Sequence, residues 1–167
     1  SGQKCSACSR VVIHETLYEK FIEALIEKTK DLNIDEAYKN PSMGPVSSRQ
    51  AFHSIMNYIE IGKKEGKIVC GGKKVERNGF FIEPTIIKDV DPNARISQEE
   101  IFGPVLSCIR ARTFDEALAI ANNTEYGLTG AVYSVNRKNL DTAKREFHVG
   151  NLYHGAFYDD SGICLLD

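Results

Sequence analysis

Residues 105–153 read VLSCIRARTFDEALAIANNTEYGLTGAVYSVNRKNLDTAKREFHVGNLY. Apolar runs typical of strands alternate here with segments typical of helices. The apolar runs at residues 105–111, 130–135 and 149–153 are typical of short strands. Between them, Thr113 and Asn136 are expected helix N-caps, and Glu116 completes a capping box with Thr113. The order strand, helix, strand, helix, strand indicates crossovers between parallel strands. We therefore predict an α/β fold with an open, mostly parallel sheet flanked by helices.

The sequence before residue 105 continues the same alternation. Two more capping boxes, Thr16 with Glu19 and Ser47 with Gln50, predict helices that begin at these residues. Pro84 interrupts an extended, β-rich run, so we expect that run to be an edge or bulged segment. The extended segments are predicted at residues 11–13, 67–70 and 80–87. No linker or internal repeat divides the chain.

Composition excludes several classes of function. The 167 residues carry a net charge of −2, so no basic field is available for nucleic acid. No apolar stretch reaches the roughly 20 residues of a membrane span, and no signal peptide is expected before Ser1. Five scattered cysteines favour a reducing, cytoplasmic compartment. The four histidines show no metal-ligand spacing, so no metal site is predicted.

Cys5 stands among small and polar residues instead of an apolar run. A nucleophilic thiolate needs access and donors for a developing oxyanion, and backbone N–H groups beside Gly2 and Ser6 could supply the donors. Two other interpretations stay open. Cys5 could be an ordinary small residue, or it could pair with Cys8 as a thioredoxin-like redox module.

Several motifs occur in order along the chain and together are more specific than any one of them. They are GQKCSACSR (residues 2–10), MGPV (43–46), GFFIEPT (79–85), EEIFGPV (99–105) and ANNTEYGL (121–128). In this order the set resembles the aldehyde dehydrogenase superfamily. The resemblance implies that residues 1–153 form that family's catalytic domain.

The resemblance narrows further within the family. GQKCSACSR, EYGLTGAVYS (residues 125–134) and FHVGNLY (147–153) are similar to the branch of 1-pyrroline-5-carboxylate dehydrogenases. That branch oxidises glutamate γ-semialdehyde to glutamate with NAD in proline catabolism. The resemblance therefore implies a small-molecule aldehyde as substrate and NAD as cofactor, and it allows a homo-oligomer.

The resemblance also implies roles for four residues. Cys5 matches the nucleophile that forms a thiohemiacetal and then a thioester. Ser6 matches a position that helps to hold the substrate carboxylate. Glu100 matches the carboxylate that bonds the nicotinamide-ribose hydroxyls, which suits its two acceptor oxygens. Phe102 matches an aromatic residue that packs near the nicotinamide.

The chain departs from the family at both ends. Before Gly2 the family has a Rossmann-type coenzyme domain, a general-base glutamate and an oxyanion-hole asparagine. Residues 154–167, HGAFYDDSGICLLD, do not match the expected continuation and are predicted to be a divergent tail. We therefore expect an incomplete catalytic domain that is inactive by itself. The alternative is a non-catalytic remnant that only folds and self-associates.

Overall fold

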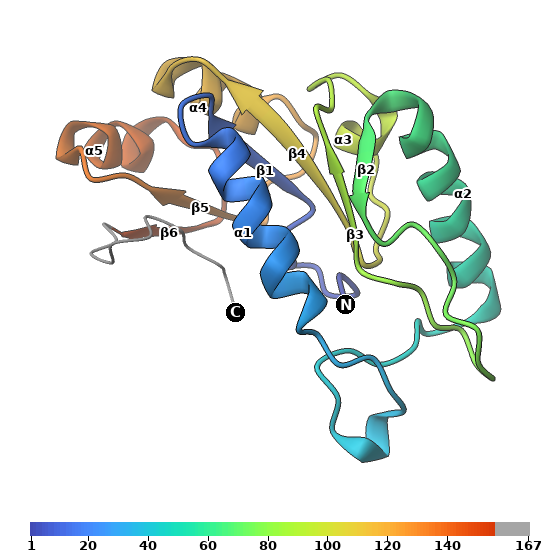
Figure 1. The fold of residues 1–167 in the computed structure, drawn as a ribbon. Coiled ribbons are helices and arrows are strands. Elements are labelled where there is room, and N and C mark those ends of the chain that lie inside the picture. The colour runs from blue at the N-terminus through green and yellow to red at the C-terminus, as the bar shows by residue number, and fades with distance from the viewer. Residues whose placement is uncertain (156–167) are drawn as a thin grey trace.

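The computed structural model describes residues 1–155, and the statements below concern that part of the chain. A four-stranded sheet has the order β1-β4-β3-β2. β4 (Val105–Ala111) pairs in parallel with both β1 (Arg10–His14) and β3 (Thr85–Lys88). β2 (Lys67–Cys70) pairs antiparallel with β3. Figure 1 shows this sheet at the centre of the molecule.

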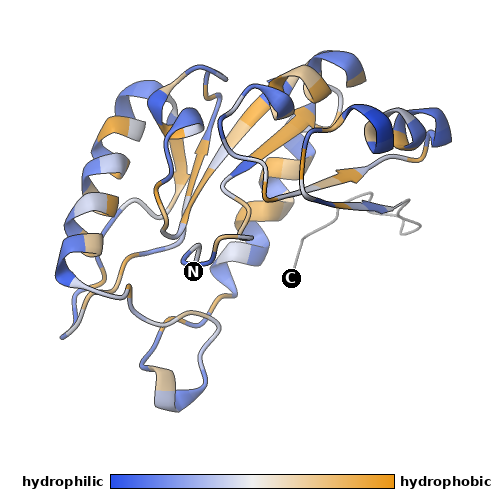
Figure 2. Ribbon diagram, turned by 180° about the vertical axis from the view of Figure 1, so that it is seen from behind, coloured by the Kyte–Doolittle hydropathy of each residue, from blue (hydrophilic) through white to orange (hydrophobic). Residues whose placement is uncertain are grey.

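Helices cover both faces of the four-stranded sheet. α1 (Tyr18–Lys30) packs on one face, and α2 (Arg49–Glu65), the short α3 (Arg95–Gln98) and α4 (Phe114–Asn122) pack on the other. A 3-10 turn, η1 (Ala37–Lys39), lies between α1 and α2. In Figure 2 the central strands are largely hydrophobic, and the helices that cover them carry both hydrophobic and hydrophilic residues. This three-layer arrangement confirms the predicted α/β class.

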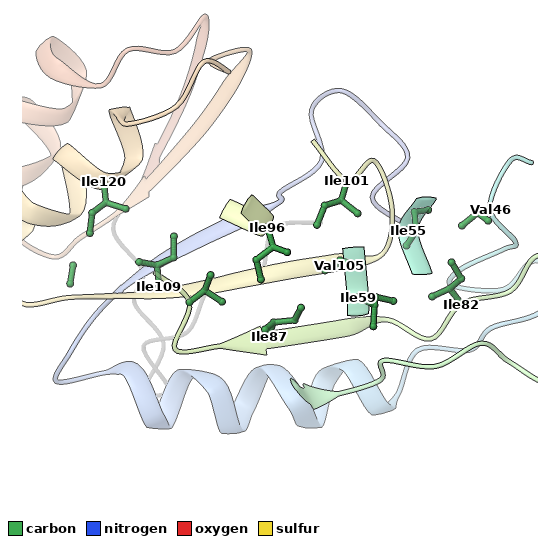
Figure 3. Packing of buried hydrophobic residues seen from close by; sticks show 12 residues of the cluster. Val46, Ile55, Ile59, Ile82, Ile87, Ile96, Ile101, Val105, Ile109 and Ile120 are labelled. Carbon is green, nitrogen blue, oxygen red and sulfur yellow. The ribbon is translucent and has the colours of Figure 1, made fainter. Parts of the chain in front are cut away.

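Two hydrophobic clusters result from the alternation of side chains along the strands. Ile86 and Cys108 face α1, where they meet Tyr18, Ile22 and Leu25. The residues that follow them in sequence face the opposite side. There Ile87 and Ile109 pack with residues of α2, α3 and α4, as Figure 3 shows: Ile55, Ile59, Ile96 and Ile120.

A second, two-stranded sheet stands apart from the first. β5 (Thr129–Tyr133) and β6 (Asn151–Gly155) pair in parallel, and α5 (Arg137–Glu146) connects them. The parallel crossover predicted for this region is therefore confirmed. The expectation of one sheet through residues 105–153 is wrong, because β4 belongs to the four-stranded sheet (Figure 1).

The helix starts test the predicted caps. Thr113 and Asn136 cap α4 and α5 by accepting from the N–H groups of Glu116 and Lys138. Thr16 is not a cap, because its hydroxyl contacts the His14 ring and α1 begins at Tyr18 without a side-chain cap. The cap of α2 is Ser48 and not Ser47.

The structure also tests the expected edge segment at Pro84 and the predicted tail. Pro84 directly precedes β3, so its missing N–H interrupts no ladder, and β3 is an interior strand instead of an edge. The irregularity in its pairing falls between Ile68 and Cys70 of β2. Of the predicted tail, residues 154 and 155 belong to β6, and residues 156–167 lie outside the described part of the chain.

The first prediction concerns the larger cluster. Ile87 is fully buried, so Ile87→Ala should lower the free energy of unfolding by about 2–5 kcal/mol, through lost burial and the cavity left behind. Val135 is 84% exposed, and Val135→Ala should change it by less than about 0.5 kcal/mol. Urea denaturation followed by circular dichroism measures both. Equal midpoints for the two variants would show that the cluster does not stabilise the fold as described.

Candidate active site

Three of the sequence motifs lie at one edge of the sheet. The Cys5 segment precedes β1, residues 99–104 precede β4, and residues 79–84 precede β3. Because these three strands are parallel neighbours, their amino ends meet at the same edge. Figure 1 shows the N-terminal segment at this lower end of the sheet.

Close contacts join these segments. Gly2 has a φ of 69°, and a Cβ there would lie 1.9 Å from the carbonyl oxygen of Gly103, so only glycine fits. The Gln3 amide bonds the backbone of Pro45 and Ser47. The N–H of Val46 donates to the Phe80 carbonyl at 2.8 Å. The structure therefore brings three further motifs, residues 43–46, 79–85 and 99–105, together around the Cys5 segment.

Cys5 and Ser6 occupy the two central positions of a tight turn. The N–H of Ala7 donates to the Lys4 carbonyl at 2.9 Å and closes the turn. Both side chains are exposed and make no hydrogen bond within residues 1–155. The N–H of Cys5 is likewise unbonded within that range, so it is available to an oxyanion. The turn thus presents an accessible thiol beside a hydroxyl.

Cys8 has a different environment. Its thiol donates to the Arg10 carbonyl at 3.2 Å, and desolvation by the surrounding chain raises its pKa, although the residue retains exposed surface. Burial raises the pKa of Cys108 to about 12. A raised thiol pKa opposes thiolate formation. The environment of Cys8 therefore favours the neutral thiol, and Cys8 is unsuited to act as the attacking thiolate.

The adjacent carboxylates Glu99 and Glu100 differ in their hydrogen bonding. Both oxygens of Glu99 accept from the Arg95 guanidinium at 2.8 Å, and one also accepts from the Tyr58 hydroxyl at 2.8 Å. These bonds lower the pKa of Glu99 to about 2. Glu100 is exposed and makes no hydrogen bond or ion pair within the described residues. Glu100 is thus the carboxylate available to a ligand.

Phe102 has an unusual backbone conformation. Its φ is 52°, and the residue is 45% exposed. A non-glycine residue in this region costs about 1–3 kcal/mol and persists only where its surroundings impose it. The Pro104 carbonyl accepts from the Thr85 N–H at 2.8 Å, and the Glu99 clamp holds the other side of the turn. The turn therefore presents the Phe102 ring to solvent.

Arg10 joins the fifth motif, residues 121–128, to this edge of the sheet. Its guanidinium donates to the carbonyls of Ala121 and Asn123, at 3.0 and 3.4 Å, where α4 ends. The Gln98 amide also donates to the Asn123 carbonyl at 2.8 Å. These bonds tie residues 121–123 to the start of β1. Gln3 and Arg10 contribute contacts that no local sequence pattern indicates.

A surface hollow of about 240 Å³ lies between the start of α2 and residues 74–80. It is lined by Phe52 and Phe80 together with charged side chains that include Arg49 and Arg77. None of Cys5, Ser6, Glu100 or Phe102 lines it.

The helices of residues 1–155 include none with the length and apolar character of a membrane span.

The second prediction separates the two carboxylates. Because the pKa of Glu99 falls from 4.5 to about 2 on folding, its ionised form stabilises the fold above pH 4.5, and that stabilisation is lost as the pH falls toward 2. Glu99→Gln should therefore lower the melting temperature at pH 7, and the difference from the parent chain should shrink toward pH 2. Glu100→Gln is the matched control and should melt like the parent chain. A Glu99→Gln difference that is constant with pH would contradict the clamp.

Comparisons with known proteins agree with this arrangement. The sequence profile of the aldehyde dehydrogenase family matches residues 1–160, which extends past the predicted boundary at residue 153. The chain is 60% identical over 154 residues to the 1-pyrroline-5-carboxylate dehydrogenase of Geobacillus kaustophilus and 56% identical to that of Bacillus cytotoxicus. Each alignment covers 92% of this chain and 30% of the relative, so the chain spans about 30% of the length of these curated relatives.

Solved structures give the same result. The Thermus 1-pyrroline-5-carboxylate dehydrogenase with bound NAD superimposes with a TM-score of 0.90 at 53% identity, over 92% of this chain and 30% of that one. A betaine aldehyde dehydrogenase from Staphylococcus aureus in complex with NAD+ superimposes with a TM-score of 0.86 at 36% identity, over 95% and 33%. Both the sequence profile and the fold confirm the predicted family. The chain belongs to the aldehyde dehydrogenase family.

Proposed function

We propose that this chain supplies the catalytic-cysteine part of an NAD-dependent enzyme that oxidises glutamate γ-semialdehyde to glutamate. One observation carries the proposal: the exposed Cys5 turn is joined through Gly2 and Gly103 to the turn that presents Glu100 and Phe102. A candidate nucleophile, a carboxylate suited to ribose hydroxyls and an aromatic ring suited to a nicotinamide thus share one edge. The names of the relatives support the choice of substrate.

The residues present suit NAD. Two neighbouring ribose hydroxyls match the two acceptor oxygens of an unengaged carboxylate, and Glu100 is such a carboxylate. The exposed Phe102 ring offers an apolar surface for the nicotinamide. When bound, NAD accepts the hydride that leaves the substrate carbon.

Cys5 and Ser6 account for the covalent step and for substrate binding, and activation of the hydrolytic water is left to the general-base glutamate that the family carries before the Cys5 motif. The Cys5 sulfur attacks the aldehyde carbon, and the Cys5 N–H stabilises the oxyanion of the thiohemiacetal. Loss of hydride leaves a thioester on Cys5, and water then attacks the acyl carbon and releases the carboxylate and the free thiol. The Ser6 hydroxyl donates to the carboxylate that the substrate already carries, which favours an acidic aldehyde.

The free thiols of Cys5, Cys8, Cys70 and Cys108 suit a reducing compartment, so the proposal includes a cytoplasmic location. It also includes association between copies. Tyr126, Leu128, Val135 and Tyr153 are large apolar residues with more than half of their surface exposed, and they lie on or beside the two-stranded sheet. Such surface favours contact with further protein.

The third prediction tests the assignment of Cys5. A chimera is made from the Geobacillus kaustophilus relative by replacing its 154 aligned residues with those of this chain. It should form NADH from glutamate γ-semialdehyde and NAD, followed by absorbance at 340 nm, and its Cys5→Ala variant should form none. The 167-residue chain alone should also form none. Full turnover in the Cys5→Ala chimera would refute the assignment.

The fourth prediction separates the two binding roles in the same chimera. Ser6→Ala should raise the KM for glutamate γ-semialdehyde roughly tenfold to a hundredfold and leave the KM for butanal unchanged, because a hydroxyl–carboxylate bond is lost. Glu100→Gln should raise the KM for NAD and leave both aldehyde KM values unchanged. Steady-state kinetics measures all three constants. Any other pairing of variant and constant would reassign the two residues.

A further inference from the structure

We propose that Gln3 is a positioning residue that fixes the Cys5 turn against the start of α2. The proposal rests on the nucleophilic role given to Cys5 above. Gln3 touches none of the reacting groups. It acts through the backbone, because the turn of residues 4–7 begins at the next residue.

Both ends of the Gln3 amide are engaged. Its Oε1 accepts from the Ser47 N–H at 2.7 Å, and its Nε2 donates to the Pro45 carbonyl at 3.4 Å. One donor and one acceptor on neighbouring residues match the two ends of a primary amide, and the match fixes the orientation of the group. The bridge joins backbone segments that are 44 positions apart in sequence.

The partner of Gln3 is a firmly held segment. Ser47 directly precedes Ser48, whose hydroxyl caps α2, and α2 is anchored in the core by the fully buried Ile59. Val46, between the two bonded residues, is itself buried and donates to the Phe80 carbonyl. Because this segment is fixed relative to the core, the hydrogen bonds to it also fix the position of Gln3.

The Cys5 turn itself has few other anchors. The side chains of Cys5 and Ser6 make no hydrogen bonds within residues 1–155. On the amino side, Gly2 is held against Gly103 and Gln3 against Pro45 and Ser47. Because a displacement of about 1 Å in a reacting group costs a large factor in rate, the Gln3 bridge should matter for turnover more than for stability.

The test uses three variants of the full 167-residue chain. Gln3→Met keeps the length of the side chain and removes both bonds. Gln3→Glu keeps the acceptor for Ser47. Gln50→Met is the matched control, because the side chain of Gln50 is exposed on α2 and makes no hydrogen bond within the described residues. Hydrogen exchange is measured by mass spectrometry at the amides of Ala7 and Ser47, beside urea denaturation.

In Gln3→Met, both amides should exchange at least about tenfold faster while the urea midpoint matches that of Gln50→Met. Gln3→Glu should restore protection of Ser47 and slow the exchange of Ala7. Unchanged exchange at Ala7 in Gln3→Met would overturn the inference, because the turn would then be held without Gln3. An equal acceleration across the whole chain would also overturn it, by showing a role in global stability alone.

The same substitution in the chimera separates this inference from the proposed function. Gln3→Met should lower kcat at least about tenfold with little change in the KM for NAD, and Gln3→Glu should recover part of kcat. An active chimera whose kcat is unaffected by Gln3→Met would overturn the positioning role. A chimera that is inactive with Gln3 in place would instead refute the proposed function, and the exchange measurements would still decide whether Gln3 holds the turn.

Discussion

β4 has a parallel neighbour on each side, and this pairing determines where every candidate site residue lies. Parallel strands begin at the same edge of a sheet, so the segments before β1, β3 and β4 must meet there. Those segments carry Cys5, residues 79–84 and the turn that contains Glu100 and Phe102. The chemistry of the site therefore depends on strand pairing, which in turn depends on the helices that cover the sheet.

The packing on both faces makes this edge rigid enough to hold strained backbone. Ile86 and Ile87, consecutive in β3, belong to the two different clusters, so neither face can shift without disturbing the other. Such a scaffold can impose the left-handed conformation of Phe102, whose cost of about 1–3 kcal/mol is small beside the burial of several isoleucines. Strain at this turn is consistent with a ring presented to a ligand instead of to the core.

Local features of this fold could be read from the sequence, and non-local ones could not. Thr113 and Asn136 were predictable caps because a cap acts within three residues. The prediction that Thr16 caps a helix was wrong, because its hydroxyl contacts the His14 ring instead. The interior place of β3 and the separate sheet of β5 and β6 depend on which strands pair, and periodicity does not specify pairing.

The candidate site shows the same limit. Cys5 was a candidate from its small and polar surroundings, but its specific role and those of Ser6, Glu100 and Phe102 came from a family resemblance, and these roles stay predictions. The Gln3 bridge to Ser47 spans 44 positions, so no short motif could indicate it. Resemblance identified the segments, and the strand pairing explains why they belong together.

Pairs of like residues show how the fold separates structural from chemical roles. Glu99 and Glu100 are adjacent, yet Arg95 and Tyr58 engage only Glu99. Cys5 and Cys8 are three residues apart, yet of the two thiols only that of Cys8 donates to a carbonyl within residues 1–155. A side chain whose hydrogen bonds are already made has little capacity left for a ligand. In each pair the engaged member has hydrogen-bond partners within the fold, and the unengaged member keeps its capacity to bond a ligand.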